Sequence, residues 1–268
     1  MNSEELLAFT SDKLLPAADN IITNSYKAYC KGYDIGVETK SDNTPATNAD
    51  REAEKALRSM ILNHYPHHGI QGEEFGAHNP DADWIWVLDP LDGTREFLAK
   101  APGNFGILIG LLYKGQACLG AVSDPVNSKY WLSGISNATG DTNKLENSIV
   151  ACTNPVGMFE TPTLRQGILT VKDKVREIKT DLNCMGFAMV VDGTFDAAIE
   201  NNLKAHDIIP LLPVMLNAGI SLVDLDGNDY TKMRFDTDDA FTERYGVVAA
   251  TSQSLINEIL DCFPKEVD

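Results

Sequence analysis

Residues 89–94, which read D-P-L-D-G-T, gather two carboxylates, a hydroxyl and a tight turn into one short segment. Pro90 keeps Asp89 out of the helical region of backbone space, and Gly93 tolerates torsions that other residues avoid. Two carboxylates this close repel each other unless a cation lies between them, and their hard oxygen atoms suit Mg²⁺ or Mn²⁺. An ordinary turn in which Asp92 caps a helix explains the same residues. The segment alone leaves both interpretations open.

Three further segments bring acids that would complete a metal site. Glu73 in G-E-E follows a strand-like run, and a buried carboxylate there would hold a metal or orient a water. Asp50 in T-N-A-D lies at a helix start, where the helix dipole alone would favour it. Asp207 in A-H-D also lies at a helix entry, where capping is the ordinary role. Each acid is ambiguous by itself, so the fold has to bring them together.

Hydrophobic periodicity predicts the elements that would position these acids in the first half of the chain. A helix is expected over residues 3–28, kinked at Pro16, and a second helix begins near Thr47 or Asn48. The acids stand at the ends of two strands, which are followed by an antiparallel meander, and the expected ranges are 69–74, 84–88, 105–113, 117–123 and 129–135. This part is typical of an α+β architecture.

The second half alternates strands and helices more regularly, which indicates α/β layering. Strands are expected at residues 148–152, 194–199, 221–224 and 245–250, and helices at 185–191, 208–217 and 252–263. A polar stretch over residues 136–147 separates the halves. We therefore predict an α+β domain at residues 1–145 and an α/β domain at 146–268.

Composition narrows the function classes. The chain has 268 residues, 43% of them hydrophobic, a net charge of −17 and a pI near 4.6. Such a surface repels polyanions, so we expect neither nucleic acid nor a membrane as partner, although divalent cations can reverse the field locally for a small phosphorylated metabolite. The five cysteines are scattered, which argues against structural zinc and disulfides. Without a leader-like start or an apolar span, we predict a cytoplasmic protein.

Together, G-E-E at residues 72–74, D-P-L-D-G-T at 89–94 and H-D at 206–207 resemble the inositol monophosphatase family over nearly the whole chain. The resemblance implies a layered αβαβα sandwich, of the type shared with fructose bisphosphatase. It also implies an Mg²⁺-dependent phosphomonoesterase that uses two or three ions, with Mn²⁺ as an alternative, and a homodimer. The first domain would then carry most metal ligands, and the second would supply Asp207 and the pocket for the leaving group.

The same resemblance implies a role for each matching residue. One ion would be held by Glu73, Asp89 and the Leu91 carbonyl, and a second by Asp89, Asp92 and Asp207, with a weaker third ion near Glu73. Asp92 and the amides of Gly93 and Thr94 would bind the substrate, with its phosphate on the two amides. Glu73 and Thr94, the latter tied to Asp50, would position the attacking water. Asn183 and Glu200 would line the leaving-group pocket, with the Asp181–Asn183 segment opposite Glu200.

The substrate is indicated by other segments than the reaction. Residues 38–50, 105–112 and 203–208 are similar to the histidinol-phosphate phosphatase branch, whereas D-G-T-R-E-F at 92–97 also resembles the adenosine bisphosphate phosphatase branch. Where the first branch has G-G-D, this chain has Asp181-Leu182-Asn183, and G-A-G-G is replaced by N-A-G-I at 217–220. The neutral Asn183 should weaken attraction to a cation such as histidinol phosphate.

We therefore favour histidinol phosphate or inositol 1-phosphate as substrate. The alternatives are a 3'(2'),5'-bisphosphate nucleotide, a sugar bisphosphate, or a catalytically silent phosphometabolite-binding protein, the last because Leu182 and Ile220 stand at glycine positions. The remaining aromatic and imidazole side chains have structural explanations. His64, His67, His68 and His78 should be solvated, His206 should pack where the family has an aromatic ring, and Trp84, Trp86 and Trp131 should be core or dimer-contact residues.

Overall fold

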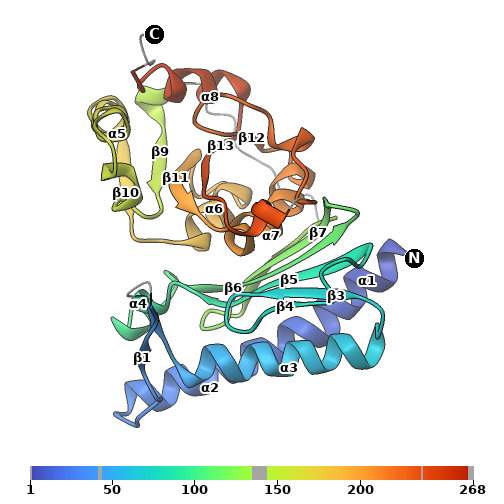
Figure 1. Cartoon of the computed structure of the whole chain (residues 1–268). Coiled ribbons are helices and arrows are strands. Elements are labelled where there is room, and N and C mark those ends of the chain that lie inside the picture. The colour runs from blue at the N-terminus through green and yellow to red at the C-terminus, as the bar shows by residue number, and fades with distance from the viewer. Residues whose placement is uncertain (1, 42–43, 135–143, 237, 265–268) are drawn as a thin grey trace.

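The computed structural model describes residues 2–41, 44–134, 144–236 and 238–264. Helices and sheets alternate in five layers (Figure 1). Helices α2 and α3 form the first layer, a six-stranded sheet the second, α6 and α7 the third, a five-stranded sheet the fourth, and α5 with α8 the last. The predicted αβαβα sandwich is therefore confirmed.

The first layer is built from three helical segments and one further helix. They are α1 (Ser3–Phe9), a π-helical turn (Thr10–Leu14), α2 (Leu15–Cys30) and α3 (Asn48–His64). The irregularity in the first helix is the π turn, closed by a bond from the Leu15 N–H to the Thr10 carbonyl. Pro16 stands directly after the π turn, in the first turn of α2, so the irregularity lies next to the expected kink.

The first sheet places two acidic strand ends side by side. Its order is β4-β3-β5-β6-β7-β8, and the strands are β3 (Gly69–Gly72), β4 (Gly76–His78), β5 (Trp84–Asp92), β6 (Gly106–Tyr113), β7 (Gln116–Asp124) and β8 (Lys129–Leu132). Strand β3 is parallel to β5, with Gly72 opposite Leu88, and β5 is antiparallel to β6. Strands β6 to β8 form the predicted antiparallel meander. Strand β8 ends at Leu132, and Ile135, expected in it, lies outside the described residues.

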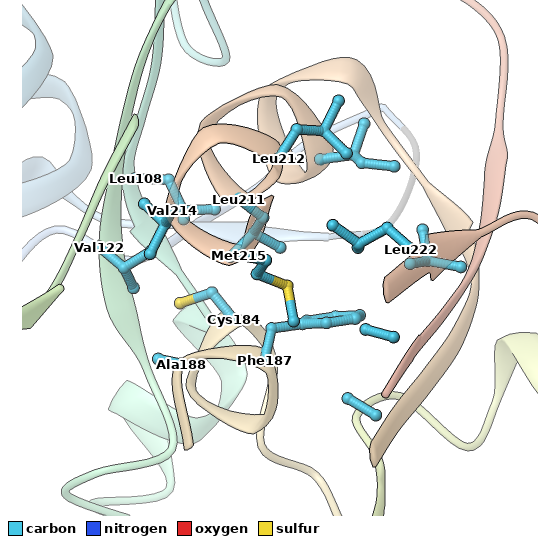
Figure 2. Packing of buried hydrophobic residues seen from close by; sticks show 14 of the residues in the cluster. Leu108, Val122, Cys184, Phe187, Ala188, Leu211, Leu212, Val214, Met215 and Leu222 are labelled. Atoms are coloured by element: carbon cyan, nitrogen blue, oxygen red, sulfur yellow. The ribbon is translucent and has the colours of Figure 1, made fainter. Parts of the chain in front are cut away.

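The middle layer consists of α6 (Cys184–Val191) and α7 (Ala205–Asn217). Figure 2 shows Leu108 and Val122 of the first sheet beside Val214 of α7, in the same apolar cluster as Phe187 of α6. Helix α7 approaches β7 so closely that a Cβ atom at Gly120 would lie 1.9 Å from the carbonyl oxygen of Pro210. A glycine is required there because any side chain would push α7 away from the sheet.

The second sheet has the order β10-β9-β11-β13-β12. Its strands are β9 (Ile149–Cys152), β10 (Glu177–Thr180), β11 (Ala197–Leu203), β12 (Ser221–Val223) and β13 (Tyr245–Ala250), and α5 (Pro162–Lys174) and α8 (Gln253–Leu260) cover its outer face. Helix α5 and strand β10 were absent from the sequence prediction. Strand β11 was expected at residues 194–199 and lies further along the chain.

The two sheets divide between Leu132 and Ile149, within the region of the polar stretch, part of which lies outside the described residues. The division into domains at residues 1–145 and 146–268 stays a prediction. Two short strands, β1 (Glu38–Thr39) and β2 (Pro45–Ala46), pair with each other before α3. Over the described ranges, we find no helix with the length and apolar character of a membrane span.

Candidate active site

The parallel pairing of β3 and β5 brings the first two acids together. Because Gly72 lies opposite Leu88, the next residues are Glu73 and Asp89, and the Glu73 N–H donates to the Leu88 carbonyl at 3.1 Å. The pairing of β5 with β6 is irregular between Asp89 and Asp92. This irregularity turns the chain, and the Leu91 N–H donates to Oδ1 of Asp89 at 3.1 Å.

The buried carboxylate of Glu54 holds the turn that follows Glu73 in place. Oε2 of Glu54 accepts the Glu74 N–H at 2.8 Å, and its Oε1 accepts the Phe75 N–H at 3.2 Å. Arg58, one turn later on α3, donates from Nε to Glu54 at 2.7 Å and from Nη2 to the Gly76 carbonyl. The turn carrying Glu73 is thus fixed to the first helical layer.

The middle layer supplies the remaining acid. Asp207 lies in the first turn of α7, where its Oδ2 accepts the Lys204 N–H at 2.7 Å. Within the described part of the chain, two sets of ligand atoms lie within 4.8 Å of one another: Asp89, Asp92 and Asp207, and Glu73, Asp89 and His206. Asp89 belongs to both sets. The structure therefore gathers the four acids for which the resemblance implied a metal-binding role.

The electrostatics of this cluster favour a bound cation. Burial, followed by the charges of Glu73, Asp92 and Asp207, raises the pKa of Asp89 well above its ordinary value. Burial and the charge of Asp207 raise the pKa of Asp92 to about 7. Without a compensating positive charge, ionising all of these carboxylates together has a high free-energy cost. Their donor atoms are hard oxygens at short mutual distances, so the residues present fit Mg²⁺.

Glu73 differs from its neighbours because cationic side chains surround it. Oε1 of Glu73 lies 3.0 Å from Nζ of Lys40, 3.6 Å from Nζ of Lys204 and 3.9 Å from Nε2 of His206. Burial alone would raise the pKa of Glu73, but the charges of His206, Lys40 and Lys204 outweigh it and hold the pKa below the ordinary value. Neither lysine was singled out from the sequence, because nothing in the local pattern links residue 40 or 204 to residue 73.

Asp50 combines the structural and the functional interpretations. It closes a capping box at the start of α3, with its Oδ2 accepting the Thr47 N–H at 2.8 Å. Its other oxygen lies 3.1 Å from the Thr94 hydroxyl, which is also 3.2 Å from the Leu91 carbonyl. Asp50 is buried, and that burial raises its pKa. The helix cap therefore positions a carboxylate behind Thr94.

A cavity of about 390 Å³ adjoins the acidic cluster. Its lining includes Glu73, Asp89, Asp92 and Asp207, together with Leu91, Gly93, Thr94, Glu96, Asn154, Glu160, Asn183, Glu200, Asn202, Lys204, His206 and Arg244. Gly93 has φ +88°, and a Cβ atom there would lie 2.7 Å from Nδ2 of Asn183. Thr94 begins the short helix α4 (Thr94–Leu98), and Gly93 is its N-cap residue.

The segment that varied from the family pattern adjoins this cavity through one residue. Nδ2 of Asn183 donates to Oε2 of Glu96 at 2.9 Å and to the Asn104 carbonyl at 2.8 Å. The Cys184 N–H donates to Oδ2 of Asp92 at 2.6 Å. Asp181 is exposed and Leu182 is buried, and neither lines the cavity, so the expectation that the whole Asp181–Asn183 segment lines it was wrong. Glu96 went unnoticed because one glutamate in a helix is an ordinary surface residue.

Glu200 lies on β11 with its carboxylate buried, where it accepts a hydrogen bond from the Thr153 hydroxyl. Burial, followed by the charges of Asp92, Asp207 and Glu96, raises its pKa well above the ordinary value. The structure therefore places both predicted pocket residues, Asn183 and Glu200, at the cavity.

Two histidines differ from the sequence expectation. His64, His67 and His78 are exposed as predicted, but His68 is buried, stacks on Tyr65 with ring centroids 4.6 Å apart, and accepts a bond from Nε1 of Trp86 at 3.0 Å. Burial lowers its pKa, in keeping with a neutral acceptor. His206 was expected only to pack, yet its Nε2 lies 3.5 Å from Oδ1 of Asp207. Trp86 and Trp131 are buried as predicted.

Sequence comparison decides the family. The profile of the inositol monophosphatase family matches residues 3–262. The chain belongs to this family. Among its relatives, the bifunctional phosphatase IMPL2 (chloroplastic) of Arabidopsis thaliana is 32% identical over 268 residues, covering 95% of this chain and 74% of the relative. A histidinol-phosphatase of Mycobacterium tuberculosis is 29% identical, covering 72% and 79%.

Solved structures of the family have the same fold. An inositol monophosphatase from Zymomonas mobilis superposes with a TM-score of 0.78 at 26% identity, covering 98% of this chain and 99% of the other. As an inositol monophosphatase family member, the protein is a phosphoric monoester hydrolase. Dependence on Mg²⁺ is typical of the family, and the acidic cluster supplies ligands of the right kind.

Proposed function

We propose that this phosphatase hydrolyses histidinol phosphate with Mg²⁺ held by Glu73, Asp89, the Leu91 carbonyl, Asp92 and Asp207. The observation that carries the reaction is the sharing of Asp89 between two ligand sets beside one cavity. When bound there, Mg²⁺ would neutralise the phosphate, activate water and stabilise the leaving oxygen. Two ions fit the two sets, and a third, weaker ion would lie near Glu73.

The chain's own groups would orient the reactants. Thr94 lines the cavity, and Asp50 behind it accepts the hydroxyl proton, so lone pairs of the Thr94 oxygen remain for a water molecule. Glu73 provides a second acceptor for that water. Gly93 is the N-cap residue of α4 and Thr94 its first residue, and their backbone N–H groups would suit a phosphate oxygen.

The pocket beside the metal cluster supports an amine-bearing leaving group. Asn183 is neutral, but its side-chain amide holds Oε2 of Glu96 at 2.9 Å, so a carboxylate is retained at the position where one seemed lost. Glu160 also lines the cavity, and Glu200 lines it as a buried group whose raised pKa favours the neutral acid. A cationic alcohol, such as the histidinol released from its phosphate ester, would pair with Glu96 better than a neutral polyol would.

A phosphate-release assay tests this proposal with histidinol phosphate, inositol 1-phosphate, fructose 1,6-bisphosphate and 3'-phosphoadenosine 5'-phosphate, each with Mg²⁺. Histidinol phosphate should have the highest kcat/KM, and inositol 1-phosphate the next. A higher kcat/KM for inositol 1-phosphate would refute histidinol phosphate as the substrate but leave the proposed hydrolysis of a phosphate monoester intact. Release from none of the four would favour a silent phosphometabolite-binding protein.

Two variants separate the metal site from the pocket. Asp92→Asn should abolish Mg²⁺-dependent release of phosphate from every ester, because it removes a ligand charge. Glu96→Gln should raise KM for histidinol phosphate about tenfold and leave inositol 1-phosphate nearly unchanged. An equal effect on both esters would show that Glu96 does not interact with the positive charge of histidinol phosphate.

One observation favours a second candidate. Arg244 lines the same cavity as Lys204, and two cations there suit a second phosphate group. A 3'(2'),5'-bisphosphate nucleotide or a sugar bisphosphate would use them. Arg244→Gln should then impair release from a bisphosphate and spare the monoesters. The homodimer and the cytoplasmic location stay predictions.

A further inference from the structure

We propose that His206 is a nitrogen ligand of the ion held by Glu73 and Asp89, and that this position therefore binds Mn²⁺ in preference to Mg²⁺. The inference rests on the proposed function only in requiring that the acidic cluster binds divalent metal. It adds an unequal pair of positions, one with oxygen ligands alone and one with an imidazole.

The positions of the atoms carry the first step. Nε2 of His206 lies 3.9 Å from Oε1 of Glu73 and belongs to one set with Asp89, whose ligand atoms are all within 4.8 Å of one another. Two ligand atoms on one ion, each at about 2.1 Å, lie roughly 3.0 to 4.2 Å apart according to their angle. The 3.9 Å between Nε2 of His206 and Oε1 of Glu73 is already within that range. The widest separation in the set is at most 4.8 Å, which is about 0.6 Å beyond the upper end of that range.

The fold fixes this imidazole at the cluster. His206 lies in the first turn of α7, its side chain is 12% exposed, and its neighbour Asp207 belongs to the other ligand set. Two lysines, Lys40 and Lys204, also lie near Glu73. A protonated ammonium group has no lone pair for a metal, whereas a neutral imidazole has one. Of the three, His206 is therefore the group suited to coordinate an incoming ion.

Ligand chemistry gives the metal preference. Mg²⁺ demands oxygen donors in near-octahedral geometry, whereas imidazole nitrogen is a better ligand for first-row transition metals, to which Mn²⁺ belongs. Asp89, Asp92 and Asp207 offer oxygens alone and suit Mg²⁺. Glu73, Asp89 and His206 offer a mixed set, which Mn²⁺ accepts and Mg²⁺ accepts poorly.

The test uses metal-free full-length protein and Mn²⁺ alone, without substrate. Mn²⁺ binding is measured by electron paramagnetic resonance, and pulsed measurements detect ¹⁴N coupled to the bound ion. Wild type should show ¹⁴N coupling. His206→Phe, which keeps an aromatic ring, should lose the coupling and bind the tighter Mn²⁺ at least about tenfold more weakly. A separate calorimetric titration of this variant with Mg²⁺ should give an affinity within about threefold of the wild-type value.

His67→Phe is the matched control, because it removes an exposed imidazole elsewhere in the chain and should change neither signal. If the His206→Phe protein fails to fold, His206→Gln is the second variant, and it should likewise lose the ¹⁴N coupling. Mn²⁺ bound by wild type without ¹⁴N coupling would overturn the inference and leave the proposed function intact. Binding of neither metal would overturn both.

Discussion

Replacing Glu54 with glutamine should destabilise the protein far more than its distance from the substrate cavity suggests. Its carboxylate accepts two backbone N–H groups, at 2.8 and 3.2 Å, and the Arg58 guanidinium at 2.7 Å. Glutamine keeps the volume but offers one carbonyl oxygen and an NH₂ group. One of these donors would then face another donor, and Arg58 would lose its charged partner.

The expected loss follows from the burial of this pair. Glu54 is fully buried. Breaking a buried ion pair by removing one charge costs about 3–5 kcal/mol. For a chain of this size, each kcal/mol lowers Tm by about 2–4 °C, so the melting temperature should fall by roughly 6–20 °C. The turn that holds Glu73 should loosen as well, which would weaken Mg²⁺ binding.

Thermal and urea unfolding, together with calorimetric titration of Mg²⁺, measure both effects. Glu52→Gln is the control, because Glu52 is exposed on the same helix and its replacement should stay within about 0.5 kcal/mol. If Glu54→Gln lost less than about 1 kcal/mol and bound Mg²⁺ normally, the idea that this buried carboxylate positions Glu73 would be wrong.

Four further predictions concern the cavity. With the pKa of Asp92 raised from 3.8 to about 7, protons compete with metal, so Mg²⁺ affinity measured by calorimetry should rise between pH 5 and 7 and level off above. The raised pKa of Asp92 also means that the folded, metal-free protein keeps a proton that the unfolded chain releases above about pH 4. The metal-free protein should therefore lose stability as pH rises from about 4 to about 7, and a Tm that climbs over this interval would contradict the prediction. Gly93→Ala, at φ +88° and against Asn183, should cost about 1–3 kcal/mol in urea unfolding and at least tenfold in kcat/KM, and a neutral result would refute the predicted strain. Glu200→Gln should cost under about 1 kcal/mol because burial favours the neutral acid, whereas a loss above 3 kcal/mol would indicate an ionised Glu200.

Much of the site was predictable because its residues stand at the ends of recognisable elements. The apolar run before Asp89 predicts a buried strand, and G-E-E predicts a neighbouring strand end. Alternation of helices and strands predicts layering, and the family resemblance supplies the order of the layers. What no local pattern states is the register of β3 against β5, which brings Glu73 beside Asp89.

The failures have separate physical causes. Helix α5 carried a readable signal, with Thr161 as cap, Pro162 in the first turn and apolar residues at 164, 168 and 171, but its polar composition hid it. His68 is buried because tertiary contacts with Tyr65 and Trp86 satisfy a side chain that the surrounding polar residues placed at the surface. Contacts such as Lys40 with Glu73 join distant segments, and a single sequence does not state them.

The close approach of α7 to the first sheet at Gly120 also bears on the order of assembly. Asp89 belongs to a sheet strand and Asp207 to the helix that docks on that sheet. The set of Asp89, Asp92 and Asp207 is consequently complete only after docking, so the ion at this set would bind the assembled layers. Bound metal would then link the docked layers through its ligands, so that the layers unfold in one cooperative transition.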